Sequence, residues 1–222
     1  MNVTEILYKF DTCETPEEKW ECVLACFDTV APSQQAQAIS ALSARLNRLP
    51  DDIRRAPPRW VHGAIKGAPA YRLGLARSIH VRARDTRDRR NAINDKKMQT
   101  FVTIAELRSI QRLKLFFCGL SDYGVTLLAS CQYLSNLKFL NLVHNHLTHT
   151  GALAILKSRN LGQLSELHLS RNHIGDYGAK QIADCTKGVC LDVLALRDCG
   201  LTSKGIHLLE QSPSLQDCSL YF

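Results

Sequence analysis

Aliphatic side chains recur at a fixed spacing through the second half of the chain. The pattern Leu-x-x-Leu-x-Leu, with Asn or Cys three positions after the last leucine, returns at steps of 27 residues. Its four complete copies start at Ile110, Leu137, Leu164 and Leu191. The last two leucines of each copy alternate with other side chains, which is typical of a strand with one buried face. An apolar segment with helical spacing follows each time, so the pattern predicts consecutive strand–helix units.

A fifth unit is predicted where Leu215-x-x-Cys218-x-Leu220 repeats the beginning of the pattern. The sequence stops one strand into this unit, and we consider two alternatives for that strand. Either it pairs with a second copy of the chain to form a weak homodimer, or it is a short edge that the fold tolerates. A strand of four or five residues offers little area to a dimer.

Each predicted helix opens on a glycine, and each predicted strand leads to a corner residue, Asn or Cys. The opening glycines are Gly124, Gly151, Gly178 and Gly205. A short side chain there lets the helix lie close to the strands. The inward helix positions are predicted to be Leu127, Ile155, Ile182 and Leu208. The corner residues, which we expect to bond backbone groups left unpaired by the turn, are Cys118, Asn145, Asn172 and Cys199.

These features resemble the leucine-rich repeats, and in particular the ribonuclease-inhibitor-like subfamily. The resemblance is carried by the Asn or Cys corner, by Gly119-Leu120-x-x-x-Gly124 and by Leu128-Ala129-x-Cys131. Gly151-Ala-Leu-Ala154 is also similar to the motif of the GALA effectors of plant pathogens. The resemblance implies an α/β solenoid of about five repeats, with parallel strands on a concave face and helices on the convex side. It also implies a scaffold that binds proteins.

The first half of the chain is predicted to cover the open end of this solenoid. Residues 1–75 contain apolar positions at helical spacing, and Thr15 with Glu18 forms a capping-box pattern before one such helix. We expect an all-helical cap there, because an exposed solenoid end needs a cover. Residues 76–109 are interpreted as a degenerate zeroth repeat, in which Ile79 and Val81 take the roles of Leu113 and Leu115. The leucine-rich repeats proper are assigned to residues 110–222.

Nine cysteines are too irregularly placed to predict a disulfide framework. Cys118 and Cys199 occupy corners, and the others lie mostly where a small apolar side chain fits a core. No stretch of 18 apolar residues appears, and the acidic N-terminal segment lacks the basic start of a secretory signal. We therefore expect a chain without a membrane span, in a reducing compartment such as the cytoplasm or, for an effector, a host cytoplasm.

Positive charge is concentrated in one part of the sequence. Residues 72–97 hold nine basic and three acidic side chains, whereas residues 1–30 hold two basic and seven acidic ones. The arginines that are candidates for binding phosphate, from a nucleic acid or an anionic membrane, are Arg84, Arg87, Arg89 and Arg90. Asp85 and Asp88 interrupt them and no aromatic side chain is interleaved, so we expect a solvated loop and no specific nucleic-acid binding.

Catalytic and metal-binding patterns are not predicted. His144, His146 and His149 have no matching Cys or acid pair at ligand spacing. Cys26-Phe-Asp28 resembles the catalytic Cys-x-Asp of a bacterial ubiquitin-ligase family that carries leucine-rich repeats, but here the triplet precedes the repeats and lacks a paired base. We expect no enzyme, no cofactor and no bound metal.

The outward strand positions are the best candidates for a binding surface. If the units are stacked in register, an apolar cluster of Phe116, Phe117, Phe139 and Val143 is rimmed by cations. The predicted partner-binding residues are Arg112, Lys114, Phe116, Phe117, Phe139, Asn141, Val143, His144, His168, Arg171, Arg197 and Asp198. Aromatic side chains beside arginines are typical of binding hot spots. The alternative is that the cap or the basic loop folds over the cluster.

The sequence therefore predicts a non-catalytic scaffold that binds a partner protein through its concave strand face. Two alternatives come from other classes of protein. One is a secreted bacterial effector that carries or recruits ubiquitin-transfer activity, and the other is a protein that binds anionic surfaces through residues 84–90. The sequence does not name the partner.

Overall fold

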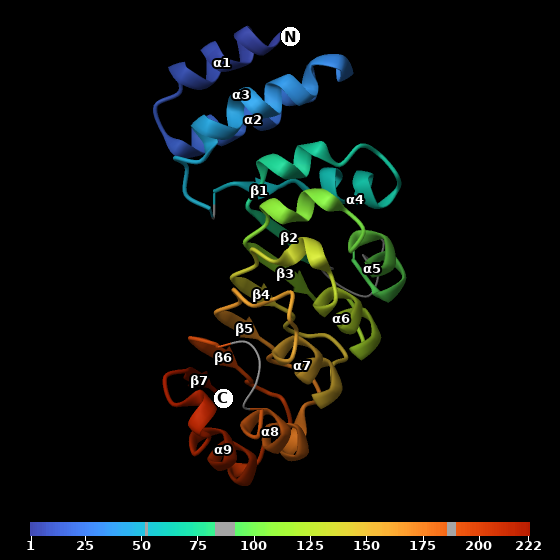
Figure 1. Ribbon diagram of the computed structural model, residues 1–222, viewed down its shortest axis with the longest axis vertical. Coiled ribbons are helices and arrows are strands. Elements are labelled where there is room, and N and C mark those ends of the chain that lie inside the picture. Colours follow the sequence, from blue (N-terminus) through green and yellow to red (C-terminus); the bar gives the residue numbers. More distant parts are fainter. Residues whose placement is uncertain (52, 83–91, 186–189) are drawn as a thin grey trace.

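The computed structural model describes residues 1–51, 53–82, 92–185 and 190–222. Figure 1 shows a curved stack of strand–helix units with a layer of three helices at its N-terminal end. The helices are α1 (Val3–Thr12), α2 (Pro16–Phe27), α3 (Gln35–Leu46), α4 (Pro58–Ile65), α5 (Asp95–Phe101), α6 (Asp122–Ala129), α7 (His149–Leu156), α8 (Gly175–Ala183) and α9 (Ser203–Glu210). The strands are β1 (Arg55–Ala56), β2 (Ser78–Arg82), β3 (Arg112–Phe116), β4 (Phe139–Asn141), β5 (Glu166–His168), β6 (Val193–Ala195) and β7 (Ser219–Tyr221). Short 3₁₀ turns are η1 (Pro32–Gln34), η2 (Tyr71–Leu75), η4 (Ala105–Ser109), η5 (Gln132–Leu134) and η6 (Pro213–Leu215).

The seven strands form one parallel sheet in chain order, β1 to β7. Leu113, Leu140, Leu167 and Leu194 lie side by side in successive strands and are fully buried. Parallel strands are about 4.8 Å apart, whereas packed helices need roughly 8–10 Å. The stack therefore curves toward the strands, and Figure 1 shows the helices spread over a longer arc than the strands. The α/β solenoid and the phase of its strands agree with the prediction.

Asparagine side chains link neighbouring units at the corner after each strand. The Oδ1 of Asn145 accepts from the amides of Cys118 and Leu120, at 3.0 and 3.1 Å. Its Nδ2 donates to the carbonyls of Leu115 and Leu142, at 2.9 and 2.8 Å. Asn172 makes the equivalent four bonds one unit later, and the Cys199 thiol contacts a carbonyl at 3.2 Å. The predicted role of the corner residues is confirmed.

Aspartates at the starts of the helices form a second link, which the sequence analysis missed. The Asp122 carboxylate accepts from the amide of Thr148 at 2.9 Å, from its hydroxyl at 2.6 Å and from the amide of Gly151 at 2.9 Å. A Cβ atom at Gly151 would collide with this carboxylate. Asp95 and Asp176 bind the following units in the same way. Gly124, Gly151 and Gly205 therefore leave room for the preceding unit's aspartate, in addition to the close helix packing that we expected, whereas Gly178 faces His149.

The buried helix positions follow the 27-residue repeat more strictly than predicted. Ile155 and Ile182 are buried as expected, but Leu128 and Leu209 are buried in place of Leu127 and Leu208, which are only partly buried. α6, α7 and α9 begin at the equivalent caps Ser121, Thr148 and Thr202, so the inward face of each is fixed relative to the strand. Because two leucines are adjacent in α6 and again in α9, the sequence alone did not show which of the two is buried.

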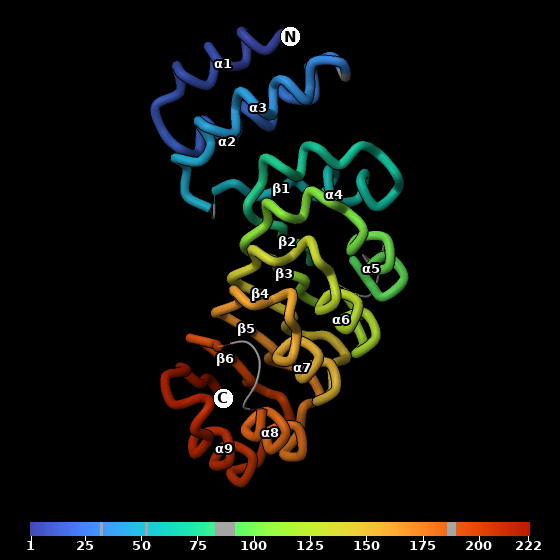
Figure 2. Tube along the Cα trace, in the orientation of Figure 1, coloured from blue at the N-terminus to red at the C-terminus, as the bar shows by residue number. Residues whose placement is uncertain are grey.

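The N-terminal region is helical, with one strand that was not predicted. The capping box of Thr15 and Glu18 is present at the start of α2. β1 pairs in parallel with β2, so that Arg55 lies beside Ser78 and the sheet extends past the zeroth repeat. The Trp20 indole donates to the Arg55 carbonyl at 3.2 Å, which ties α2 to this added strand. Figure 2 shows that α1 to α3 form a layer stacked on the solenoid end.

A buried arginine joins the helical layer to the sheet. Arg54 is 2% exposed, and its Nε and Nη2 donate to the carbonyl of Leu75 at 3.0 and 2.6 Å. Burial, with the nearby Arg77, lowers its pKa to about 10. Asp28 at the end of α2 adds ion pairs to Arg59 and Arg72, at 3.3 and 2.7 Å. The cap and the first strands are thus held together by polar contacts as well as by apolar packing.

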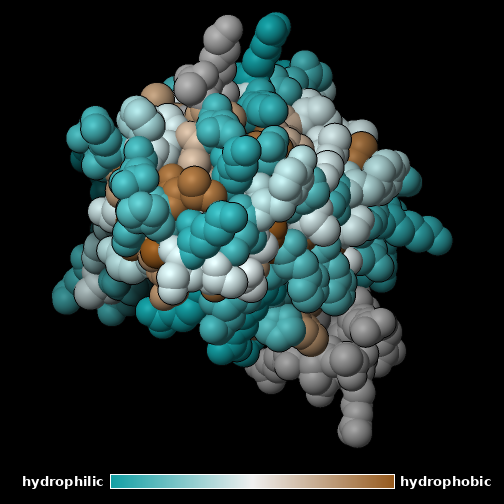
Figure 3. All heavy atoms as spheres, turned by 90° about the horizontal axis from the view of Figure 1, so that it is seen from below, coloured by the Kyte–Doolittle hydropathy of each residue, from teal (hydrophilic) through white to brown (hydrophobic). Residues whose placement is uncertain are grey.

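The strand register of the fifth unit differs from the prediction. Leu220 lies beside Leu194, the place expected for Cys218, because the link from the last helix turn to β7 is one residue shorter than in the other units. Leu201, Leu215, Leu220 and Phe222 are only partly buried at this end of the stack. Figure 3 views the molecule from this end and shows hydrophobic residues enclosed by hydrophilic ones.

Candidate functional site

The concave face consists of the side chains that point away from the buried leucines. Its first row across the sheet is Arg55, Ser78, Arg112, Phe139, Glu166, Val193 and Ser219. Its second row is His80, Lys114, Asn141, His168, Ala195 and Tyr221. The predicted alignment of the outward positions of β3 to β6 is confirmed. β2 pairs with β3 in the register expected for Ile79 and Val81. The further extension over β1 was not predicted, because Arg55 lies in a segment expected to be helical.

Phe139 lies beneath cationic neighbours and is not open to solvent as predicted. The guanidinium carbon of Arg112 is 4.1 Å from the ring centroid and the Lys114 Nζ is 5.4 Å from it. The His168 ring lies on another side, with the centroids 5.0 Å apart. Phe139 is only 6% exposed as a result. Long side chains of β3 cover the ring because cations are attracted to its face.

His168 is held in an environment that disfavours its charged form. Burial lowers its pKa, and Lys114 and Arg112 lower it further, whereas Glu166 acts in the opposite direction. The Nε2 of His168 lies 3.9 Å from the Glu166 carboxylate, which is too far for a hydrogen bond. His168 is therefore a neutral partner of Phe139 near neutral pH.

A second aromatic group lies at the other ends of the strands. The Phe117 ring meets His144 edge to face at 4.4 Å, and the Phe116 ring is 6.1 Å from the same histidine. The Arg82 guanidinium lies 4.7 Å from the Phe116 centroid. Phe116 is four residues beyond Arg112, the neighbour of Phe139, which is a separation of about 13 Å along a strand. The single apolar cluster that we predicted is therefore two groups, of which the second is partly exposed.

The residue after each strand adopts a left-handed backbone. The φ angles are 54° for Phe117, 59° for His144, 59° for Arg171 and 55° for Asp198. Residues other than glycine seldom adopt this conformation, so the corner imposes the same local strain in four units. The side chains of these four residues form a column along the edge of the sheet at which the strands end. Within it, Arg171 pairs with Asp198 at 3.4 Å.

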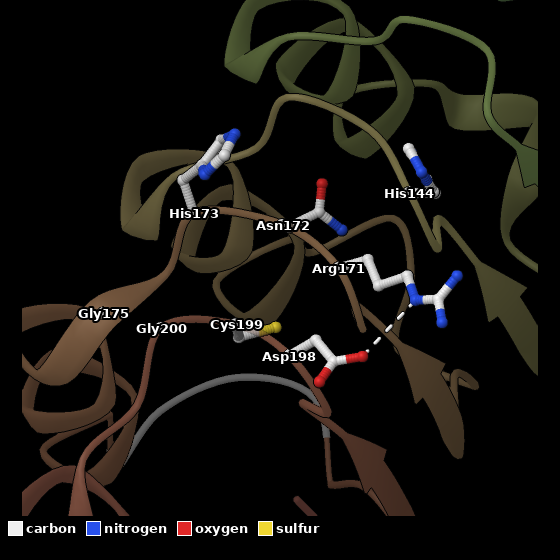
Figure 4. Close-up of a pocket in the computed structure, with 8 residues that line it drawn as sticks. All are labelled: His144, Arg171, Asn172, His173, Gly175, Asp198, Cys199 and Gly200. Carbon is white, nitrogen blue, oxygen red and sulfur yellow. Dashed lines mark hydrogen bonds and ion pairs between the residues drawn. The ribbon is translucent and has the colours of Figure 1, made fainter.

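A hollow of about 600 Å³ lies beside this column. It is lined by His144, Arg171, Asn172, His173, Gly175, Asp198, Cys199 and Gly200. Figure 4 shows that these residues come from three successive corners, with the Arg171–Asp198 pair at its edge. Asn172 and Cys199 are buried and serve the corners. The hollow is open to solvent, and its buried polar groups already have hydrogen-bond partners within the corners. It is therefore a groove between neighbouring units.

The N-terminal half of the concave face is positively charged. The Nη1 of Arg55 is 3.4 Å from the Nδ1 of His80. Burial lowers the pKa of His80 to about 4, and the positive charges of Lys114, Arg55 and Arg112 contribute to this shift. The sequence did not reveal this group of charges, because Arg55 and Arg112 are far apart in the chain and meet only through β2.

A family model described as "Leucine Rich repeat" matches residues 133–156, which contain β4 and α7, and residues 164–183, which contain β5 and α8. The chain contains leucine-rich repeats. Together with the parallel sheet and the outer helices, this identifies the fold as a leucine-rich-repeat solenoid with a helical N-terminal region. Among curated proteins, no sequence matches the chain.

Three solved structures are similar to this leucine-rich-repeat chain at low identity. Actin-binding site 2 of leiomodin-1 is 19% identical, with a TM-score of 0.44, over 71% of this chain and 90% of that one. The tropomodulin C-terminal domain of Caenorhabditis elegans is 13% identical, with a TM-score of 0.46, over 71% and 92%. An internalin of Listeria monocytogenes is 17% identical, with a TM-score of 0.37, over 68% and 48%.

The remaining candidates of the sequence analysis do not form a reactive centre with the repeats. Cys26 is 6% exposed, and Asp28 is bound by two arginines. The Cys22 sulfur is 4.0 Å from that of Cys26, and burial, with Cys26 and Cys13, raises the pKa of the Cys22 thiol to about 12. A thiol with so high a pKa is a poor nucleophile at neutral pH.

His144 and His149, which were considered and rejected as metal ligands in the sequence, lie in different surroundings. His144 packs on Phe117, and His149 meets the Tyr177 ring at 4.9 Å on the helical side. Within residues 1–51, 53–82, 92–185 and 190–222, no three His, Cys, Asp or Glu side chains are grouped as metal ligands. No helix in these ranges is long and apolar enough to cross a bilayer. The candidate anion-binding residues Arg84, Arg87, Arg89 and Arg90 lie outside the described residues.

Proposed function

We propose that this protein is a non-catalytic scaffold that binds a partner protein on the concave face of its repeats. The observation that carries the proposal is the partly exposed group of Phe116, Phe117 and His144, with Arg82 over the Phe116 ring. Aromatic side chains beside an arginine give large contact area and directional contacts to a partner. The sheet holds this group on a rigid strand end, so little ordering of the binding surface is needed on association.

The repeats also favour the ribonuclease-inhibitor-like type within the leucine-rich repeats, which we propose as the finer assignment. The Cys or Asn residues at the corners, Cys118, Asn145, Asn172 and Cys199, support it, as do α-helices of eight or nine residues after β3 to β6. The resemblance of Cys26-Phe-Asp28 to the motif of a ubiquitin-ligase family does not favour a ubiquitin-transfer function, because Cys26 is buried in the cap and Asp28 is paired with two arginines. The scaffold is therefore the function that the site supports best.

Affinity capture with matched variants tests the scaffold. Phe116→Ala removes an aromatic side chain from the concave face, and Tyr177→Ala removes one that is 63% exposed on α8, on the helical side. We expect the wild type and Tyr177→Ala to retain the same protein from a native lysate, and Phe116→Ala to weaken its binding about 30-fold, or by roughly 2 kcal/mol. Unchanged retention by Phe116→Ala, with loss on Tyr177→Ala, would place the interface on the helices and end the proposal.

A further inference from the structure

We propose that the cationic N-terminal half of the concave face, formed by Arg55, His80, Arg82, Arg112 and Lys114, binds an extended, acidic segment of the partner protein. This inference rests on the proposed function and adds the chemistry of the partner. The group is called the cationic quarter below, and it lies on β1, β2 and β3.

The strand register brings these side chains together from three parts of the sequence. Arg55 lies beside Ser78, and Ser78 beside Arg112, so two guanidinium groups flank β2 in the first row. His80 lies beside Lys114 in the second row, and Arg82 beside Phe116 in the third. With strands about 4.8 Å apart and rows about 6.6 Å apart, four cations fall within an area of roughly 10 by 13 Å. An extended segment of five or six residues spans this area.

The positive charge of the cationic quarter is not balanced by carboxylates of the described residues. Within the described part of the chain, carboxylates pair with Arg45, Arg59, Arg72, Arg77 and Arg171, but with none of the four cations of the cationic quarter. Glu166 is the nearest outward acid in these rows, two strands beyond Arg112, and it faces His168. A ligand that supplies carboxylates would therefore remove repulsion that the free protein retains.

His80 reports this repulsion from within the group. The charged groups that face it are Arg55 from β1 and Arg112 and Lys114 from β3, and all three lower its pKa in addition to the effect of burial. Arg112 and Lys114 are also held over the Phe139 ring, so their charges are fixed in position before any ligand arrives. Fixed, uncompensated charges favour a ligand of opposite sign at small entropic cost.

The shape of the face favours a polypeptide over other anions. A concave strand surface cannot lie flat on a bilayer. Phe139 is buried beneath Arg112 and Lys114 and cannot stack on a nucleotide base, and Arg82 over the Phe116 ring competes with such stacking. Carboxylates on alternate residues of an extended chain are about 6.6 Å apart, which matches the spacing of the rows.

Fluorescence anisotropy with the full chain tests the inference. The probe is a labelled ten-residue peptide of alternating Glu and Ser, and the control peptide has Gln in place of each Glu. We expect the acidic peptide to bind at low salt and to weaken as salt is added, and the control peptide not to bind. The double variant Arg112→Gln with Lys114→Gln should lose at least tenfold in affinity. The matched control, Lys157→Gln with Lys204→Gln on exposed positions of the helical side, should lose none.

A second readout follows His80 itself. NMR titration of its ring should show that the pKa of His80 rises when the acidic peptide is bound, because carboxylates favour the charged imidazole. If the Arg112 and Lys114 variant unfolds, the exposed pair Arg55→Gln with Arg82→Gln gives the same test. Equal binding of the two peptides, or unchanged affinity in a folded cationic-quarter variant, would overturn the inference.

Two competing anions are included in the same assay. Tighter binding to vesicles of an anionic phospholipid, or to a single-stranded oligonucleotide, than to the acidic peptide would also overturn it. These outcomes can be distinguished from a failure of the proposed scaffold function. A partner captured through Phe116 with no dependence on Arg112 or Lys114 keeps the scaffold and removes only the acidic segment.

Discussion

The corner after each strand repeats its bonding from unit to unit, whereas the concave face of the same strands changes its residues from unit to unit. At the corners, Asn145 and Asn172 make the same four bonds one unit apart. On the concave face, the first outward position of consecutive strands is Arg112, Phe139 and then Glu166. Positions that recur every 27 residues hold the fold, and positions that change from unit to unit are free to recognise a partner.

The largest loss of stability is expected when a corner asparagine is removed. Asn145→Ala removes the partner of two buried amides and of the Leu115 carbonyl, whereas the Leu142 carbonyl keeps its bond from Asn172. We therefore expect a loss of about 3 kcal/mol or more in the free energy of unfolding. Asn141→Ala, an outward position on the same strand, should cost less than about 1 kcal/mol. Urea denaturation followed by circular dichroism measures both. Similar losses for the two variants would remove the distinction between corner and face.

Phe139 is an exception to this contrast, because it is an outward residue that is nevertheless buried. We expect Phe139→Ala to destabilise the protein by roughly 2–3 kcal/mol, because it removes a ring packed against Arg112, Lys114 and His168. Phe116→Ala should cost less than about 1 kcal/mol, as its ring is partly exposed. The sequence analysis placed both rings on the binding surface, and the burial of Phe139 is the reason why we expect the two variants to differ. Thermal melts that rank the two variants in reverse would contradict this assignment.

The acid sensitivity of the concave face is a third test. His80 has its pKa lowered from an ordinary 6.5 to about 4, so the unfolded chain binds a proton there at a pH where the folded protein does not. This contribution to the free energy of unfolding is complete above pH 6.5 and is lost as the pH falls from 6.5 toward 4. We expect a loss on the order of 2 kcal/mol across that window, reduced in His80→Gln. Identical pH profiles for the two proteins would show that neither burial nor the neighbouring cations lower the pKa of His80 in the folded protein.

The smallest effect is expected at the C-terminal strand. β7 is three residues long, and a strand of this length exposes too little area for a stable dimer. Light scattering at micromolar concentration should therefore give a monomer for both the wild type and Tyr221→Lys, whose side chain is 52% exposed in the wild type. A wild-type dimer that dissociates in Tyr221→Lys would establish end-to-end pairing as a second binding surface.

The sequence predicted the features that each unit repeats. The phase of the strands and the bonding of the corners followed from the 27-residue spacing, because one unit informs the next. Contacts between units without a repeated apolar signal were missed, as with Asp122 and Gly151. The burial of Phe139 was missed because it depends on the length of Arg112 and Lys114. The strand β1 was missed because its two residues, Arg55 and Ala56, carry none of the repeated leucines.

Site-specific photo-cross-linking tests most directly whether partners dock on the concave face. A photoreactive phenylalanine analogue is placed at Asn141 in the middle of the strand face, and in a second protein at Tyr177 on the exposed side of α8. We expect one partner protein to be linked from position 141 and none from position 177, with linkage suppressed by an excess of unmodified protein. Linkage of the same partner from position 177 alone would contradict the account, because the repeats would then bind through their helices.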